Sequence, residues 1–290
     1  MNIEATHLGK QSSYPQHYDP SVLVAVPRIL NREQYGISDN ALPFSGVDVW
    51  HAYEFSFLTA KGAPVIGLLK IVYPCNNESL VESKSLKLYL NSFNMDRFGE
   101  TRAEGISAVT QIIGKDLSEL LKCKVQVAYF DQNAQPSNSD FNDFSILEET
   151  VDFDNISCTI YTETPDLLQE SQTSGKIKWA THLLRSNCKI THQPDWGSLF
   201  IEMNGKQLPT PESFLKYIVS LRNENHFHEE ICEMVFKRLI DVYAPEKLMV
   251  ACMYTRRGGI DINPVRVLPG SELPATLVNP DLRTNLSFRQ

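Results

Sequence analysis

The chain has 290 residues, 42% of them hydrophobic and 21% charged, and this composition is typical of a folded globular protein with one large domain or two smaller ones. Its formal net charge is −8 and no cluster of Lys and Arg stands out, which argues against a nucleic-acid partner, because phosphate neutralisation dominates such binding. No apolar run approaches the roughly 20 residues of a membrane span, and the N-terminus shows no secretion signal, so we expect a cytoplasmic protein with no membrane partner.

The first half predicts strand, strand, helix, helix and strand, in that order. β-Branched and aromatic residues indicate the strands, and the turn AKGAP separates the first two. Apolar residues from Ile106 to Leu120 recur at helical spacing and indicate the longer helix. The predicted strands are 47–58, 65–73 and 124–130, and the predicted helices are 83–93 and the segment around 106–120.

The second half repeats this order. Thr210 is predicted to cap a helix whose first residue is Pro211, because threonine and proline are favoured at these two positions. Residues 228–243 show the apolar periodicity of a second, amphipathic helix. The predicted strands are 177–186, 198–203 and 247–254, and the last of them opens a terminal pair.

An internal duplication is our working interpretation. Residues 86–100 and 215–229 align with five identities in fifteen positions, and the two halves share their order of elements. The fold class is therefore predicted to be α+β, with an antiparallel sheet backed by a pair of helices in each half.

Between the halves lies a segment, 131–175, that is rich in Asp, Glu, Ser, Gln and Thr. Residues 125–175 hold ten acids and no Lys or Arg, so the rest of the chain carries 35 − 10 = 25 acids against 27 bases. A segment with few apolar residues buries little surface, and we expect this acidic connector to be ordered in part at most.

Six cysteines are dispersed without a C-x-x-C pair, which is typical of free thiols in a reducing compartment. Cys188 stands apart, because Arg185, Lys189 and His192 lie within four residues and nearby cations favour a nucleophilic thiolate. Asp195 follows in the same polar segment, which we interpret as a loop, and there it could donate a proton. The alternative is an ordinary loop, since Asp is common in turns.

Two further segments carry candidate binding groups. The motif HFHEE (226–230) lacks the H-E-x-x-H spacing of a zinc site, but Glu229 could accept paired hydrogen bonds from the amidine-like edge of a purine or pterin. The alternative is a charged first turn that complements the helix dipole.

The motif TRRGG (255–259) is either a hairpin turn or a place where guanidinium groups and bare backbone meet a phosphate. The chain has no G-x-G-x-x-G fingerprint, so any nicotinamide cofactor would need a non-Rossmann site.

Four motifs together resemble the NADPH-dependent 7-cyano-7-deazaguanine reductases, the nitrile reductases of queuosine biosynthesis. They are ESKSLKLYLNSFN (82–94), SNCKITHQPDWGS (186–198), FHEE (227–230) and YTRRGGIDINP (254–264). Because ESKS precedes the cysteine motif, the chain is similar to the long form of the family, in which tandem tunnelling-fold (T-fold) modules share one site. The resemblance implies a homodimer, and it implies a first module at 1–130, the acidic connector at 131–175 and a second module at 176–290.

The family's functional positions carry over residue by residue. Cys188 matches the nucleophile that forms a covalent thioimidate with the nitrile, Asp195 matches the general acid, and we expect Trp196 to wall the pocket. The matched deazapurine contacts are Glu82, Ser83, Lys84, His228 and Glu229, and the matched NADPH contacts are Lys84, Ser85, Arg257 and Gly258. The resemblance implies reduction of the nitrile to a primary amine with NADPH and without a metal. The alternative is a zinc-dependent purine or pterin cyclohydrolase of the same fold, in which Cys188 and histidines would bind the metal.

Overall fold

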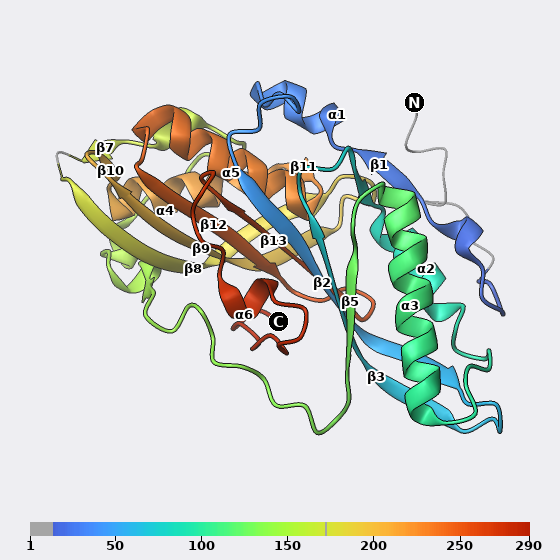
Figure 1. Cartoon of the computed structure of the whole chain (residues 1–290). Coiled ribbons are helices and arrows are strands. Elements are labelled where there is room, and N and C mark those ends of the chain that lie inside the picture. The colour runs from blue at the N-terminus through green and yellow to red at the C-terminus, as the bar shows by residue number, and fades with distance from the viewer. Residues whose placement is uncertain (1–13, 172) are drawn as a thin grey trace.

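One nine-stranded sheet dominates the computed structural model, which describes residues 14–171 and 173–290 (Figure 1). Its strands pair antiparallel, except that the short strands β6 and β11 run parallel to β8. In spatial order the strands are β11(Asn225–His226), β8(Gly175–Cys188), β9(Pro194–Gly205), β12(Lys247–Tyr254), β13(Ile260–Val267), β2(Ser45–Leu58), β3(Pro64–Pro74) and β5(Gln126–Phe130), with β6(Ser145–Ile146) also against β8. Two small sheets pair β1(Ala25–Pro27) with β4(Ser79–Val81) and β7(Glu170–Ser171) with β10(Leu208–Pro209).

Two pairs of helices pack on one face of this sheet. Helices α2 and α3 share an apolar core with β2 and β3, and α4 and α5 share a second core with β8, β9 and β12. Thr210 Oγ1 accepts a hydrogen bond from the Ser213 N–H at 3.2 Å, which confirms the predicted cap of α4. The helices are α1(Ile29–Arg32), α2(Ser83–Asn91), α3(Arg102–Leu121), α4(Pro211–Ser220), α5(His228–Tyr243) and α6(Ala275–Val278). In the described ranges, no helix combines the length and the apolarity that crossing a bilayer requires.

The α+β class and the antiparallel pairing are confirmed, but the two halves do not form separate sheets. Strand β13 of the second half pairs with β2 of the first over eight residues, from Ile260 opposite Ala52 to Val267 opposite Ser45. An unpaired edge strand would leave a row of N–H and C=O groups without partners, and this pairing removes two such edges. The two halves are therefore joined in one hydrogen-bonded sheet, and side chains from both halves can meet beside this junction.

The opposite face of the sheet is covered by the connector and by the segment around α6. Strand residues that alternate with those of the helical cores, such as Val49, Phe200 and Met249, pack there with Phe141 and Leu277. Lys70 of β3 is fully buried, and its ammonium group donates hydrogen bonds to the carbonyls of Thr276, Asn279 and Leu282.

The acidic connector is more firmly packed than its composition predicts. It has little regular structure apart from β6, β7 and the short 3₁₀ helices η4(Leu147–Glu149), η5(Phe153–Asn155) and η6(Pro165–Leu167). Yet Leu147 and Leu168 are buried in the core of the second half. Its acids also pair with that half, because Glu163 accepts both hydrogen bonds of an Arg238 fork, at 2.9 and 3.1 Å. Partial order at most was therefore the wrong expectation, since few but well-placed apolar residues fix the segment.

Candidate active site

Most of the predicted site residues, all except Glu82 and Ser85, come from four distant segments and meet beside the junction of the two halves. They surround a cavity of about 200 Å³, which adjoins a smaller one of about 30 Å³. Both cavities are lined by Ser83, Cys188, His228, Arg257 and Ile262. The larger one adds Lys84, Lys87, Thr191, Gln193, Gly258 and Ile260, and the smaller one adds Trp50, Leu80, Val81, Asp195, His226, Phe227 and Glu229.

Cys188 and Asp195 lie on a β-hairpin, although the sequence predicted a loop between the strands 177–186 and 198–203. Strand β8 continues to Cys188 and β9 begins at Pro194, so only 189–193 form the turn. Ser186 pairs with Asp195, and the Gln193 carbonyl accepts a hydrogen bond from the Cys188 N–H at 2.8 Å. Because side chains alternate along a strand, the thiol, the Ser186 hydroxyl and the carboxyl group face the same side of the hairpin.

Asp195 is nearly buried, with 7% of its surface exposed, and two groups hold it. One carboxylate oxygen contacts the guanidinium group of Arg257, which comes from the turn between β12 and β13. The other lies 3.4 Å from Nε2 of His228, whose ring lies against that of Tyr254 at a centroid distance of 3.9 Å. Within the described chain, this His228 nitrogen has no partner with hydrogen-bond geometry. It is therefore available to a ligand in the cavity.

Glu229, at the start of α5, is a buried carboxyl group beside the smaller cavity. Burial, and next the negative charge of Asp48, raise the pKa of Glu229 to about 8, so the group is protonated at neutral pH. Its Oε1 has no hydrogen-bond partner among the described residues, and neither has the indole N–H of Trp50, which lines the same cavity. Buried polar groups are rarely left unpaired, so these two atoms mark a place where a polar heterocycle can bind.

The ESKS motif surrounds the first turn of α2, and its residues divide into two pairs. Ser83 and Lys84 line the larger cavity. The carboxylate of Glu82 caps the helix, where it accepts hydrogen bonds from the Lys84 N–H at 2.9 Å and the Ser85 N–H at 2.7 Å. Ser85 is fully buried, and its hydroxyl group donates to the Glu82 carbonyl and accepts from the Val24 N–H. Neither Glu82 nor Ser85 lines either of these two cavities, so in this structure they hold the turn that presents Ser83 and Lys84.

A cationic rim surrounds the larger cavity. Arg257 is 42% exposed, and Gly258 follows it with φ of 57°, a conformation that suits glycine. A Cβ atom at Gly258 would collide with the ammonium group of Lys87, which also lines the cavity. Sequence reasoning missed Lys87, although it lies one turn after Ser83 and Lys84 on the same helix, and that spacing could have identified it.

Trp196 does not form the wall that we expected, because it faces the opposite side of β9 from Asp195. It lies instead among three arginines, with guanidinium carbons 5.3 to 5.9 Å from its ring centre: Arg185, Arg222 and Arg289. His192 also points away and contacts the Asn225 side chain at 2.7 Å. Apolar walls come from residues of the first half and of β13, such as Trp50 and Ile262.

In residues 14–171 and 173–290, no three His, Cys, Asp or Glu side chains are grouped so that they could hold a metal ion.

Comparison with known proteins identifies the family. Residues 14–129 match the family described as nitrile reductase, 7-cyano-7-deazaguanine-reductase N-term, and residues 194–269 match the family described as QueF-like protein. The NADPH-dependent 7-cyano-7-deazaguanine reductase of Chromohalobacter salexigens is 40% identical over 278 residues, which cover 95% of this chain and 96% of that protein. This chain belongs to the 7-cyano-7-deazaguanine reductase family. Among solved structures, the archaeosine synthase QueF-Like in the apo form covers 35% of this chain and 99% of its own, with 19% identity and a TM-score of 0.30.

The two family matches thus fall one on each half of the chain, and both halves carry motifs of the site. The matched ranges include Ser83 and Lys84 in the first half and Asp195, His228 and Arg257 in the second. Residues 130–193, which include Cys188, lie between the two matched ranges, and the full-length relative spans them.

Proposed function

We propose that the protein reduces the nitrile of 7-cyano-7-deazaguanine to the primary amine 7-aminomethyl-7-deazaguanine with NADPH, a four-electron step in tRNA queuosine biosynthesis. The observation that carries the proposal is that several reactive and binding groups meet at two adjoining cavities in a member of this family. They are the Cys188 thiol, the buried Asp195 carboxyl group, the Glu229 and His228 side chains, each with a polar atom that lacks a hydrogen-bond partner in the described chain, and a cationic rim.

In this proposal Cys188 and Asp195 act together on the nitrile. The thiol proton of Cys188 passes to the Asp195 carboxylate, the sulfur forms a bond to the nitrile carbon as one C–N π bond breaks, and the nitrogen takes that proton from Asp195 to give a thioimidate. NADPH, when bound, supplies hydride to the carbon of the C=N bond, two molecules for each nitrile. Each reduction also takes one proton from solvent, and after the first of them the bond between sulfur and carbon breaks, so that Cys188 regains its proton from the nitrogen and returns unchanged. Covalent capture in this way divides a difficult reduction into easier steps.

We assign recognition of the deazapurine to the smaller cavity. Glu229 is placed to accept a hydrogen bond at Oε1 from the N–H edge of the base, and His228 lies beside it. Trp50 and Ile262 provide apolar surface for a flat ring. Pockets of this kind, mostly apolar with a few convergent polar groups, are typical of small-molecule sites.

We assign the cofactor to the larger cavity and its rim. Lys84, Lys87 and Arg257 fit the phosphates of NADPH in charge, and the bare backbone at Gly258 allows a phosphate to approach closely. Ser85 supports this site through the first turn of α2 rather than by direct contact. These cations also suit the 2′-phosphate that distinguishes NADPH from NADH.

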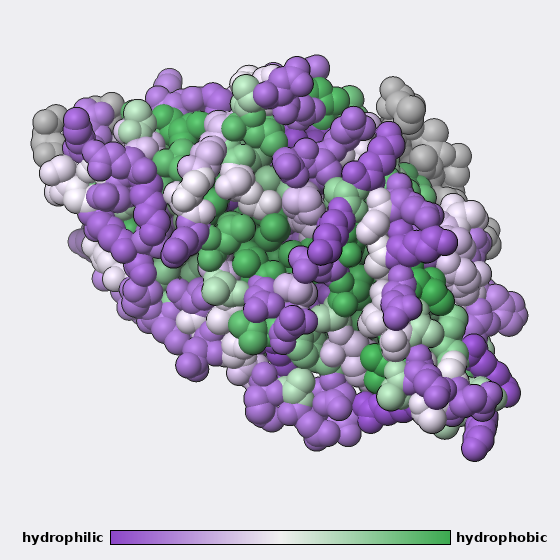
Figure 2. All heavy atoms as spheres, viewed as in Figure 1, coloured by the Kyte–Doolittle hydropathy of each residue, from purple (hydrophilic) through white to green (hydrophobic). Residues whose placement is uncertain are grey.

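We further propose that the chain consists of two T-fold modules, 1–130 and 176–290, joined by the connector 131–175, and that it works in the cytoplasm as a homodimer. Figure 2 shows hydrophobic residues over the middle of the sheet within a mostly hydrophilic rim, on the face that carries α6. Light scattering on a size-exclusion column tests the homodimer, for which the mass should be twice the chain mass of 32.9 kDa.

The decisive experiment is intact mass spectrometry of the protein with 7-cyano-7-deazaguanine and without NADPH. The proposal predicts an adduct with the full mass of the nitrile, lost in Cys188→Ala and retained in Cys158→Ala, a half-buried thiol outside both cavities. An adduct that persists in Cys188→Ala contradicts the proposal. Absorbance at 340 nm should then show two NADPH oxidised per nitrile, whereas one would mean that the reaction stops at the imine.

A further inference from the structure

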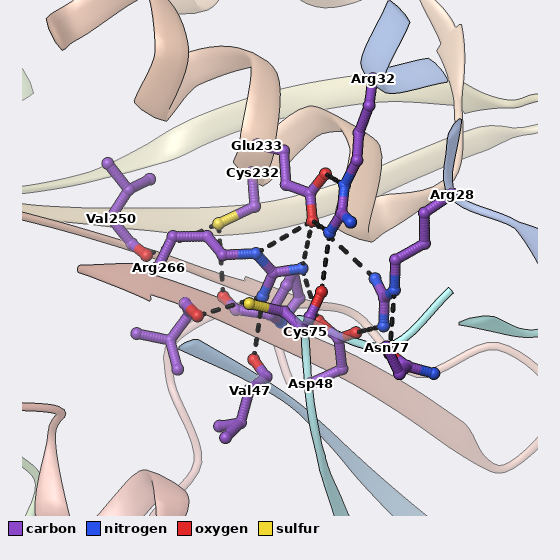
Figure 3. Close-up of polar contacts among 12 residues, drawn as sticks. Arg28, Arg32, Val47, Asp48, Cys75, Asn77, Cys232, Glu233, Val250 and Arg266 are labelled. Atoms are coloured by element: carbon purple, nitrogen blue, oxygen red, sulfur yellow. Dashed lines mark hydrogen bonds and ion pairs between the residues drawn. The ribbon is translucent and has the colours of Figure 1, made fainter. Parts of the chain in front are cut away.

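Five charged side chains form a buried network behind the active site (Figure 3). Each is at most 3% exposed, and together they comprise three cations and two anions: Arg28, Arg32, Arg266, Asp48 and Glu233. Burial of so many charges is costly unless each is paired and hydrogen-bonded. The five side chains therefore have to keep their positions relative to one another, because each charge needs its partners.

Glu233 of α5 is the centre of the network. Its two oxygens accept a fork from Arg32, with Nε at 2.9 Å and Nη2 at 2.7 Å, and one of them also accepts Nη2 of Arg266 at 2.9 Å. Figure 3 shows the three side chains converging from α5, the N-terminal segment and β13. Because a bidentate fork fixes both distance and orientation, Glu233 has little freedom to move.

The same arginines tie α5 to the first half of the chain. Arg32 also donates to the carbonyl of Cys75, just after β3, at 2.7 Å, and pairs with Asp39 at 2.8 Å. Arg266 donates to the carbonyl of Val47 on β2 at 3.0 Å. A single helix of the second half is thus held against backbone of the first half, beside the junction where the cavities lie.

Glu233 lies one helical turn after Glu229, so the two carboxyl groups project from the same face of α5. His228 and Glu229 form the first turn of this helix and reach the cavity with unpaired polar atoms. Nothing else at that turn fixes the Glu229 carboxyl oxygen Oε1, which has no partner in the described chain. Glu230 also anchors this turn, through the Phe227 N–H and Lys189, and the Tyr254 ring packs against His228. The network is therefore the anchor one turn further along α5, on the side of Glu229.

The network and Glu229 are also coupled through their charges. After burial, Asp48 contributes most to the raised pKa of Glu229, and Arg28 and Arg266 act in the opposite direction. Any displacement of these groups would therefore change both the place and the charge of the carboxyl group that faces the cavity.

We propose that Arg32 and Glu233 are positioning residues for the deazapurine site, because they hold the first turn of α5 so that His228 and Glu229 meet the ligand from fixed positions. This inference rests on the proposed function and adds to it that the N-terminal segment, through Arg32, supports the substrate site. Side chains that contact a ligand are held in the geometry that binding requires when a second layer of hydrogen bonds fixes them.

The test compares two arginine-to-lysine substitutions on equivalent forks. Arg32→Lys keeps the charge and loses the fork on Glu233, whereas Arg238→Lys does the same to the fork on Glu163, which also anchors α5 but lies away from both cavities. A lysine cannot reproduce a planar fork. For Arg32→Lys we expect KM for the nitrile to rise about tenfold and KM for NADPH to change less than twofold. For Arg238→Lys both constants should stay at the wild-type value, even if thermal stability falls.

Equal effects of the two substitutions on KM for the nitrile, or no effect of Arg32→Lys, would overturn the proposal. If Arg32→Lys does not fold, Asp39→Asn removes only the more exposed partner of Arg32 and should raise the same KM by about threefold. An unchanged KM for the nitrile in a folded Asp39→Asn protein would then contradict the proposed positioning role of Arg32 and Glu233. If the wild-type protein oxidises no NADPH with the nitrile, it is the proposed function that fails, independently of these comparisons.

Discussion

The guanidinium group of Arg257 contacts the carboxylate of Asp195 across the mouth of the cavity, and the two side chains differ greatly in exposure. The arginine side chain is 42% exposed and the carboxylate side chain 6%. Arg257 therefore joins the solvent-facing rim, where a phosphate would bind, to the interior, where the nitrile would react. A bound phosphate would compete with Asp195 for the same guanidinium group.

Replacement of Arg257 by alanine is expected to weaken NADPH binding. The loss of one charge-assisted contact to a phosphate should raise KM for NADPH about tenfold or more. Arg256→Ala is the matched control, because the neighbouring arginine lies over the Tyr53 ring at 4.0 Å and lines neither cavity. Steady-state kinetics in both substrates measure the two variants, and equal KM values for NADPH would exclude the assignment of Arg257 to the cofactor.

Asp195→Asn should slow adduct formation while leaving ligand affinity nearly intact. The amide has the size of the carboxyl group but cannot give up a proton in the same way, and loss of general acid catalysis typically costs about 10²- to 10⁴-fold in rate. Quenched-flow mass spectrometry without NADPH gives the rate of adduct formation with the nitrile. Calorimetric titration in a Cys188→Ala background gives the affinity. A rate within threefold of the wild type would show that another group supplies the proton.

The secondary structure was largely predictable, because its signals are local. Residues 228–243 were predicted as a helix from their periodicity alone, and α5 spans that same range. Strand β8 was harder, since the predicted strand ended at Ser186 and the polar residue Asn187 after it resembles a loop, but both residues lie on the hairpin that carries Cys188. Their pairing partners, Asp195 and Pro194, make them part of a ladder that polarity alone does not reveal.

The candidate site was predictable only where a motif existed. Cys188, His228 and Arg257 came from motifs, and the structure brings them to one cavity. Trp50 was missed, because the alternation of a strand does not say which of its faces will meet the other half of the chain. The contact between Arg32 and Glu233 joins residues 201 positions apart, and no local pattern indicates such a pair.

Glu229 is expected to make the folded protein less stable as the pH rises. Its pKa is about 8 in the folded chain and close to the ordinary 4.5 in the unfolded chain, so the folded state binds more protons between these values. Its contribution is fully present below the lower value, and it is lost by up to about 1.4 kcal/mol per pH unit as the pH rises towards the higher one.

Glu229→Gln tests this linkage, because the amide keeps the shape and removes the titration. In urea unfolding, the free energy of the wild type minus that of the variant should fall between about pH 5 and about pH 8. Glu163→Gln is a suitable control on a carboxylate that is paired with Arg238 outside the cavities. A difference that stays level for Glu229→Gln would mean that the carboxyl group is already ionised at neutral pH.

Glu82 presents two separable roles, one seen in the structure and one predicted from the family. Its carboxylate caps α2 through the Lys84 and Ser85 N–H groups, yet each oxygen keeps an acceptor position that a deazapurine could use. Serine is also a good helix cap, so Glu82→Ser should keep the turn that presents Ser83 and Lys84. Glu82→Ala should lower the free energy of unfolding by about 1 kcal/mol, which Glu82→Ser should largely restore.

If Glu82 also binds the base, its loss must reduce affinity even where the cap is restored. We therefore expect both variants to bind 7-cyano-7-deazaguanine about tenfold more weakly than the wild type in a Cys188→Ala background, measured by calorimetric titration. Thermal unfolding of the same samples shows whether the cap is intact. Wild-type affinity in Glu82→Ser, together with weak binding in Glu82→Ala, would reduce the role of Glu82 to holding the helix, because only the variant that loses the cap would then lose the ligand.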